Sequence, residues 1–150
     1  MTRAAKAQGC GNVEYSRWRY RKQMRKGRVV VTFAQVIQAA RAFPGTQEST
    51  SYGTPALKVR GKLLARVHQT EDSFVLRTEF LDREILMQSD PTVFYITDHY
   101  HNHPWVLVRF SVVAASALPE LVERAWRVIA PKAIVKAYDL ERSKLVPRSR

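Results

Sequence analysis

The chain has 150 residues and a mass of 17.2 kDa, the size of one ordinary domain. Hydrophobic residues make up 45% of it and aromatic residues 10%, which is enough for a buried core and excludes a wholly disordered chain. The net charge is +12 and the isoelectric point is about 10.3, which at first points to a nucleic-acid partner.

The N-terminal segment is charged and lacks the apolar stretch of a signal peptide. No apolar run approaches the roughly 18 residues that a membrane span needs. The one cysteine, Cys10, cannot form an internal disulfide or a multi-thiolate metal site, which suits a reducing compartment. We therefore expect a cytoplasmic protein without membrane contacts, and a monomer is the favoured state.

The excess positive charge lies at the two ends of the chain. Residues 1–28 hold nine basic residues and one acidic residue, and residues 132–150 hold six basic and two acidic residues. The part between them, residues 29–131, therefore sums to zero. This distribution predicts a flexible basic extension, a single domain and a basic tail. Their predicted limits are residues 1–28, 29–138 and 139–150.

Three interpretations of the N-terminal extension stay open. It is a solvated tail, an extension upstream of a domain that starts near Met24, or an arm that binds phosphates through counterion release. Aromatic residues such as Trp18 lie between the arginines, where they could stack on bases. The phosphate contacts of such an arm would come from Arg17, Arg19, Arg21 and Lys22.

The first predicted element of the domain is an amphipathic helix over residues 33–43, where apolar residues recur at helical spacing. Thr32 suits its N-cap, and Pro44-Gly45 ends it. Residues 45–55 are rich in Gly, Ser, Thr and Pro and are predicted as a loop. Three strands are then predicted as an antiparallel meander, at residues 56–59, 62–68 and 74–77.

The second half of the domain begins with a helix from about Leu81 that Asp90-Pro91 ends. Two strands at 93–97 and 105–110, a helix at 117–130 and a short helical turn at 132–138 follow. The order α-β-β-β-α-β-β-α indicates an α+β, two-layer fold, with an antiparallel sheet of about five strands and three main helices. On the long helix, the spacing predicts the ion pairs Glu120–Arg124 and Glu123–Arg127.

Basic residues interrupt otherwise apolar predicted strands at four positions: Lys58, Arg66, Arg77 and Arg109. Strand alternation puts Arg109 on the side of Trp105, and Arg66 opposite Leu63. If the basic side chains converge on the sheet face that no helix covers, they form a partly aromatic surface suited to phosphates or a carboxylate. The alternative is an ordinary polar sheet face, whose cations pair with Glu71, Glu79 or Asp82.

The segment SYGTP at residues 51–55 is predicted as a tight turn, because Gly53 and Pro55 favour one. Tyr52 would cover an edge of the core. Because the segment is polar and precedes the strand that carries Lys58, a small-anion pocket is the alternative. It is not a phosphate-binding P-loop, since the Gly-Lys-Ser/Thr ending is absent.

Three histidines alternate at His99, His101 and His103, and in an extended segment they would share one face, as the ligands of a Zn²⁺ ion do. Such a run in a connecting loop is more often incidental, and we predict no metal site. The sequence has no G-x-S-x-G elbow and no paired carboxylates in a motif. We therefore expect no cofactor and no enzymatic activity.

Four segments together resemble the MmcQ/YjbR family: SYGTPALKVRGKLLARV at 51–67, TDHYHNHPWVLVRF at 97–110, FAQVIQAARAFPGTQEST at 33–50 and LPELVERAWRVIAPK at 118–132. The resemblance covers about residues 32–136 and leaves both basic ends outside. It implies a small α+β domain with a double-wing arrangement, similar in fold to frataxin-like proteins. The acidic ridge expected of an iron-binding frataxin is not evident. Members of the family are usually described as predicted DNA-binding proteins.

The sequence thus predicts a DNA-binding protein that contacts the phosphate backbone with little sequence preference. The predicted contacts in the domain are Lys58, Arg66, Arg77 and Arg109, with Trp105 and Tyr52 beside them. The alternative is a module for a small acidic ligand or a protein partner, with no nucleic-acid role. Because the excess charge lies outside the domain, the DNA-binding prediction rests on the resemblance and on the strand residues.

Overall fold

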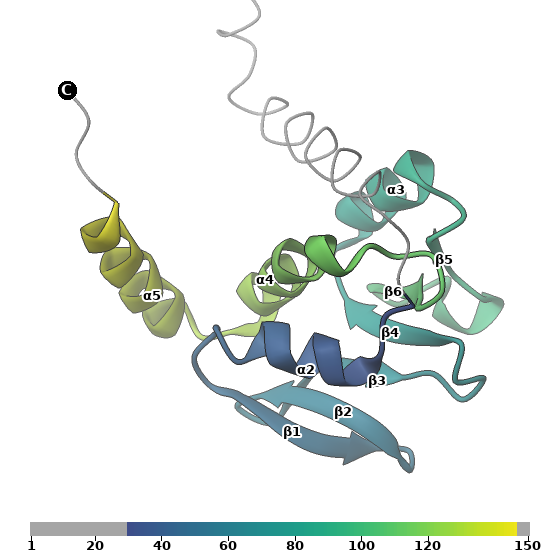
Figure 1. Cartoon of the computed structure of the whole chain (residues 1–150), viewed down its shortest axis with the longest axis horizontal. Helices are drawn as coiled ribbons and strands as arrows, with labels where there is room; N and C mark the ends of the chain where they lie inside the picture. Colours follow the sequence, from purple (N-terminus) through teal and green to yellow (C-terminus); the bar gives the residue numbers. More distant parts are fainter. Residues whose placement is uncertain (1–29, 147–150) are drawn as a thin grey trace, which may run out of the picture.

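The computed structural model describes residues 30–146, which form a six-stranded antiparallel sheet and four α-helices (Figure 1). The strands are β1 (Thr46–Ser51), β2 (Thr54–Val59), β3 (Lys62–Val67), β4 (Ser73–Arg77), β5 (Phe94–Tyr95) and β6 (Trp105–Arg109). The helices are α2 (Phe33–Ala40), α3 (Phe80–Ser89), α4 (Leu118–Ile129) and α5 (Lys132–Leu145), with short 3-10 turns at Asp98–Tyr100 and Ala115–Ala117. The strand order is β1-β2-β3-β4-β6-β5. The predicted α+β class is confirmed.

Helices α2 and α4 cover one face of the sheet because the side chains that alternate onto that face are apolar (Figure 1). Phe74 of β4 and Val108 of β6 are fully buried there, opposite each other in the register. From α4, Trp126 enters the same core, and its indole N–H donates to the Pro44 carbonyl oxygen at 2.9 Å. Full burial of each large apolar side chain contributes about 1.5–3 kcal/mol to folding.

The segment predicted as a loop at residues 45–55 instead contains a sixth strand, β1, and a two-residue turn. β1 pairs with β2 from Thr46↔Val59 to Ser51↔Thr54. Its sequence TQESTS is polar because β1 is an edge strand, which buries little and is held mainly by main-chain hydrogen bonds to its one neighbour. The meander therefore has four strands, and the prediction of about five strands in the sheet was one too low.

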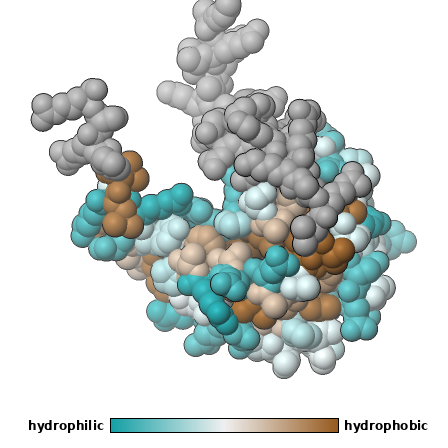
Figure 2. Space-filling view, viewed as in Figure 1, coloured by the Kyte–Doolittle hydropathy of each residue, from teal (hydrophilic) through white to brown (hydrophobic). Residues whose placement is uncertain are grey.

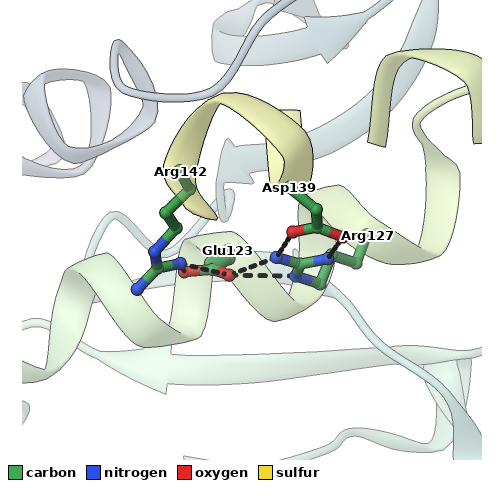
Figure 3. Close-up of polar contacts among 4 residues, drawn as sticks. All are labelled: Glu123, Arg127, Asp139 and Arg142. Atoms are coloured by element: carbon green, nitrogen blue, oxygen red, sulfur yellow. Dashed lines mark hydrogen bonds and ion pairs between the residues drawn. The ribbon is translucent and has the colours of Figure 1, made fainter. Parts of the chain in front are cut away.

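The C-terminal region also differs from its prediction, because α5 continues to Leu145 instead of ending at residue 138. Ile134, Val135 and Tyr138, which lie inside the predicted turn, pack against the core and anchor the first half of α5. Ion pairs between α4 and α5 hold the next turns (Figure 3). Seven residues of the predicted C-terminal tail, residues 139–145, are thus helical, and the fold has four α-helices within residues 30–146.

Other boundaries and pairs are close to their predictions. Helix α2 ends at Ala40, and at its start the Thr32 N–H donates to Gln35 Oε1 at 2.9 Å. Strand β5 is confined to Phe94–Tyr95. The pair Glu123–Arg127 is confirmed at 2.8 Å. In contrast, Arg124 does not form the predicted ion pair with Glu120 of its own helix. It pairs with Asp82 of α3 at 2.9 Å, so this ion pair joins two helices.

A β-bulge in β3 changes which side chains share a face. The pairing of β2 with β3 runs Leu57↔Ala65 and then Lys58↔Leu63, so one residue of β3, Leu64, is extra. Leu64 and Ala65 both lie in the helix-side core. Strict alternation had put Arg66 opposite Leu63, and that prediction was wrong, because the bulge brings the two side chains to the same face, where they line one cavity.

Surface hydropathy is mixed, with apolar residues both in the body of the domain and at the free end of α5 (Figure 2). Leu140, Leu145 and Val146 are exposed there. Within residues 30–146, no helix has the length and apolar content that crossing a membrane requires.

Candidate nucleic-acid interface

The sheet face opposite α2 and α4, here called the open face because no α-helix of residues 30–146 covers it, carries the basic strand residues around a small apolar cluster in which Tyr100 packs on Val75 and Leu107. A row of paired residues crosses four strands on it: Arg66, Val75, Leu107 and Tyr95. Arg77 and Arg109 lie two residues from Val75 and Leu107, so they project to the same side. Lys58 joins them, because both of its neighbours in β2, Leu57 and Val59, lie in the helix-side core. The structure therefore brings all four predicted strand cations to one face.

Each arginine of the open face lies against an aromatic ring. The guanidinium carbon is 5.3 Å from the ring centroid of Tyr52 for Arg66, and 5.7 Å from that of Trp105 for Arg77. Arg109 is closest, 3.9 Å above the ring of Tyr95. The Tyr95 hydroxyl is itself held by Ser73 Oγ at 2.8 Å. Cation–π contacts of this kind orient the cation while leaving its N–H groups free to bind acceptors.

Ion pairs do not neutralise these cations within residues 30–146. None of the four open-face cations has a carboxylate partner in that range, so the predicted alternative of pairing with Glu71, Glu79 or Asp82 is not what the structure shows. Their hydrogen bonds go to neutral oxygens instead. Arg77 Nη1 donates to the Pro104 carbonyl at 3.3 Å, and Arg109 Nη1 donates to the Thr92 carbonyl at 3.4 Å.

Arg66 is the most buried cation of the open face, with 5% of the residue exposed. Its Nη2 donates to the Tyr100 hydroxyl at 2.5 Å, and its Nη1 donates to the Val67 carbonyl at 3.2 Å. A guanidinium has five N–H donors, so three have no acceptor among the described residues. Withdrawing an ion from water without a counter-charge costs several kcal/mol, and an anionic ligand at Arg66 would offset that cost.

A cavity of about 460 Å³ opens on this face beside Arg66. Small-molecule sites have volumes of about 300–1,000 Å³, so the cavity is large enough for a ligand. Its polar and aromatic walls come from Tyr52, Arg66, His99, Tyr100, His103 and Trp105. Of the predicted site residues, it brings together Tyr52, Arg66 and Trp105. Lys58, Arg77 and Arg109 lie on the same face but outside the cavity.

Arg83 of α3, for which the sequence predicted no role, holds the loop that forms one wall of the cavity. It is 4% exposed, and its Nη1 donates to the carbonyls of Tyr100 at 2.9 Å and His103 at 2.6 Å. Its Nη2 donates to the carbonyl of His101 at 3.1 Å. In the sequence Arg83 is one charge in the helical stretch FLDREIL, and nothing there marks it as buried.

The three alternating histidines do not meet, because Asp98–Tyr100 form a 3-10 turn instead of an extended segment. The ring centroids of His99 and His103 are 6.1 Å apart. Residues 30–146 contain no group of three or more His, Cys, Asp or Glu side chains arranged to hold a metal ion.

Two titratable groups beside the open face have shifted pKa values. The pKa of His68 is lowered, first by burial and then by the nearby charge of Arg66. The pKa of Asp72 is lowered chiefly by the hydrogen bond from Thr70 Oγ1, with Arg109 as a smaller contributor.

The predicted arm residues Arg17, Arg19, Arg21 and Lys22 lie outside the described residues. The structure therefore bears only on the contacts predicted within the domain.

A profile of the YjbR family matches residues 41–128, which is more than half of the chain. The chain belongs to the YjbR family. All the cavity-lining residues named above lie inside the matched range. The fold of this YjbR-family protein is similar to that of the Deinococcus radiodurans protein DR2400, a DUF419 domain, with a TM-score of 0.59 over 81% of this chain and 93% of that one. The two sequences are 22% identical, so this likeness concerns the fold alone.

Curated relatives of this YjbR-family protein include Rv2570 of Mycobacterium tuberculosis and Mb2600 of Mycobacterium bovis, both named as uncharacterised proteins. Each is 38% identical to the chain over 53 residues. The matched region spans 35% of this chain and 41% of each relative.

Proposed function

We propose that this YjbR-family protein binds DNA through its open face, by contacts to phosphates and with little sequence preference. The observation that carries the proposal is the set of four cations on one sheet face, none of them paired with a carboxylate within residues 30–146. Phosphate oxygens are strong acceptors for guanidinium and ammonium groups. Contacts to phosphates position a protein on nucleic acid but do not read its sequence.

The proposed role is binding without chemistry. The residues that line the cavity include His99 and His103 but no serine, cysteine or carboxylate that an imidazole would activate or that would orient it. The N-terminal arm, with Arg17, Arg19, Arg21 and Lys22, is proposed to add phosphate contacts, since it carries much of the excess charge.

The test is the dependence of DNA affinity on salt, measured with the full chain. Replacing Arg109 or Lys58 by Ala should flatten the plot of log K against log salt by about 0.9 for each phosphate that the variant no longer binds. The matched control is Lys136→Ala, which removes one exposed positive charge from α5, in the helical layer, and should leave the slope almost unchanged.

A second variant separates the arm from the domain. In it, Arg17, Arg19, Arg21 and Lys22 are all replaced by Gln, while the open face is intact. We expect weaker but still salt-dependent binding. If the arm variant does not bind at all and the open-face variants keep the wild-type slope, the interface lies in the arm and the open face has no part in it.

The second candidate function, a site for a small acidic ligand, is favoured by the cavity beside the incompletely satisfied Arg66. A thermal-shift screen of organic phosphates and carboxylates tests it, since a ligand that binds only the folded state raises apparent stability by mass action. A shift that disappears in Arg66→Met would favour this function. The absence of a shift with any anion would exclude it.

A further inference from the structure

The turn between β1 and β2 holds an aromatic residue in an unfavourable backbone conformation. Tyr52 and Gly53 are the two central residues of this turn, with φ of 52° and 76°. Two positive φ values in a two-residue hairpin strongly favour Asn-Gly or Asp-Gly, and a tyrosine in the left-handed region is strained. The Tyr52 side chain is 84% exposed, so burial in the core does not offset the strain. The next hairpin turn has the same conformation at Arg60-Gly61, with φ of 50° and 84°, so the strain belongs to this type of turn and does not by itself mark a site.

What distinguishes Tyr52 from the turn residue Arg60 is its position beside the cavity. Its ring lies over the guanidinium of Arg66 and forms part of the cavity wall, and Trp105 contributes a second aromatic wall from β6. The side chains of Gln69 and His103 add hydrogen-bonding groups to the lining of the cavity. The cavity therefore offers aromatic surface, hydrogen-bonding groups and one buried cation, which match the flat face, the polar edge and the phosphate of a single nucleotide.

Building on the proposed function, we infer that the cavity receives one unpaired base of a single-stranded nucleic acid, with Arg66 at a phosphate of that strand. In a duplex the flat faces of the bases are covered by their neighbours, so a base can enter a pocket only from a single strand or after it has been flipped out. The open face would thus bind the strand through its phosphates, and Tyr52 and Trp105 would stack against the inserted base.

The experiment compares strands that carry the same charge. The affinity of the full chain is measured for a short oligothymidylate, for a strand of the same length with abasic residues, and for the corresponding duplex. We expect the oligothymidylate to bind about tenfold more tightly than the abasic strand, which is the size of the effect of stacking one base on an aromatic side chain.

Tyr52→Asn is the decisive variant, because asparagine suits the turn and the protein should fold at least as well. We expect it to lose the preference for oligothymidylate and to keep the wild-type affinity for the abasic strand. Arg66→Met should weaken the binding of both strands equally, because it removes a cation that binds phosphate. Lys136→Ala, the control, should retain the preference.

The outcomes separate this inference from the proposed function. If oligothymidylate and abasic strands bind equally well and with the same salt dependence, the base site is wrong while phosphate binding stands. A preference that stays at its wild-type size in Tyr52→Asn would also overturn the base site. If neither strand nor the duplex binds, the proposed function itself fails.

Discussion

Two buried arginines of this domain, Arg83 and Arg66, differ in the number of hydrogen-bond acceptors around the guanidinium group. Arg83 donates through Nη1 and Nη2 to four backbone carbonyls of the segment from Tyr100 to Trp105, whereas its buried Nε has no partner among the described residues. Arg66 has two acceptors, the Tyr100 hydroxyl and the Val67 carbonyl. Arg83 is therefore a structural residue that positions the cavity wall, whereas Arg66 keeps donors for a ligand.

Replacing Arg83 by Met should reduce the free energy of unfolding by about 3 kcal/mol, because buried carbonyls lose their donor. Urea denaturation measures the change. Arg124→Ala is the control, since Arg124 forms a partly exposed ion pair with Asp82 and its loss should cost less than about 1 kcal/mol. Similar costs for the two variants would show that the carbonyls find other donors and that Arg83 does not hold the loop.

His68 should make stability depend on pH. Its pKa in the folded protein is lowered, so between the unfolded value of about 6.5 and the folded value the unfolded state binds the proton more readily. Stability should therefore fall as the pH is lowered through this interval. Thermal melts of the wild type and of His68→Gln test this: the wild type should lose stability relative to the variant on acidification. An unchanged difference would mean that the pKa is not lowered.

At the scale of elements, the junction of α4 and α5 combines an ion-pair network with aromatic packing. Arg127 donates to Asp139 through Nη1 at 3.0 Å and Nη2 at 2.7 Å, and Glu123 accepts from both Arg127 and Arg142 (Figure 3). The pKa of Asp139 is lowered, chiefly by the bonds from Arg127. Beneath the network, the ring of Tyr138 lies 5.1 Å from that of Trp126, edge to face.

We expect packing to contribute more than charge to the attachment of α5. Tyr138→Ala should cost about 2 kcal/mol, since it removes a half-buried ring that packs against Phe43 and Trp126. Asp139→Asn should cost clearly less than Tyr138→Ala, because its carboxylate is exposed and solvent screens the pair. Chemical denaturation of the two variants is the measurement. The reverse order would show that the ion pairs dominate the junction.

The helix with the strongest apolar pattern, α4, was predicted nearly to the residue. Strand β1 and the C-terminal half of α5 lack such a pattern and were not predicted. The apolar positions of α4 recur at helical spacing, and its predicted limits of 117–130 are close to Leu118–Ile129. β1 has the composition of a loop, and it is a strand because β2 offers it a pairing edge. The end of α5 carries mostly polar and charged residues, and it is helical where α4 supplies partners for Asp139 and Arg142.

At the scale of the whole molecule, the charges of residues 29–131 sum to zero, but they are not all paired with one another. Several acidic residues pair with arginines of the helices, as in Asp82–Arg124 and Glu123–Arg127. The cations of the open face have no such partners among the described residues. Four cations without carboxylate partners among the described residues therefore share one face of a part of the chain whose net charge is zero.

The sequence alone determined the family, the α+β class and the residue types of the candidate site, because hydrophobic periodicity and local motifs carry that information. Only the tertiary structure decided that Arg66 lies beside Leu63, since a bulge shifts strand alternation by one residue. It also decided the burial of Arg83 and the placement of Tyr52 and Trp105 in the walls of one cavity. These interactions join strands and loops far apart in the chain, and no local pattern records which distant carbonyl or ring a side chain will meet.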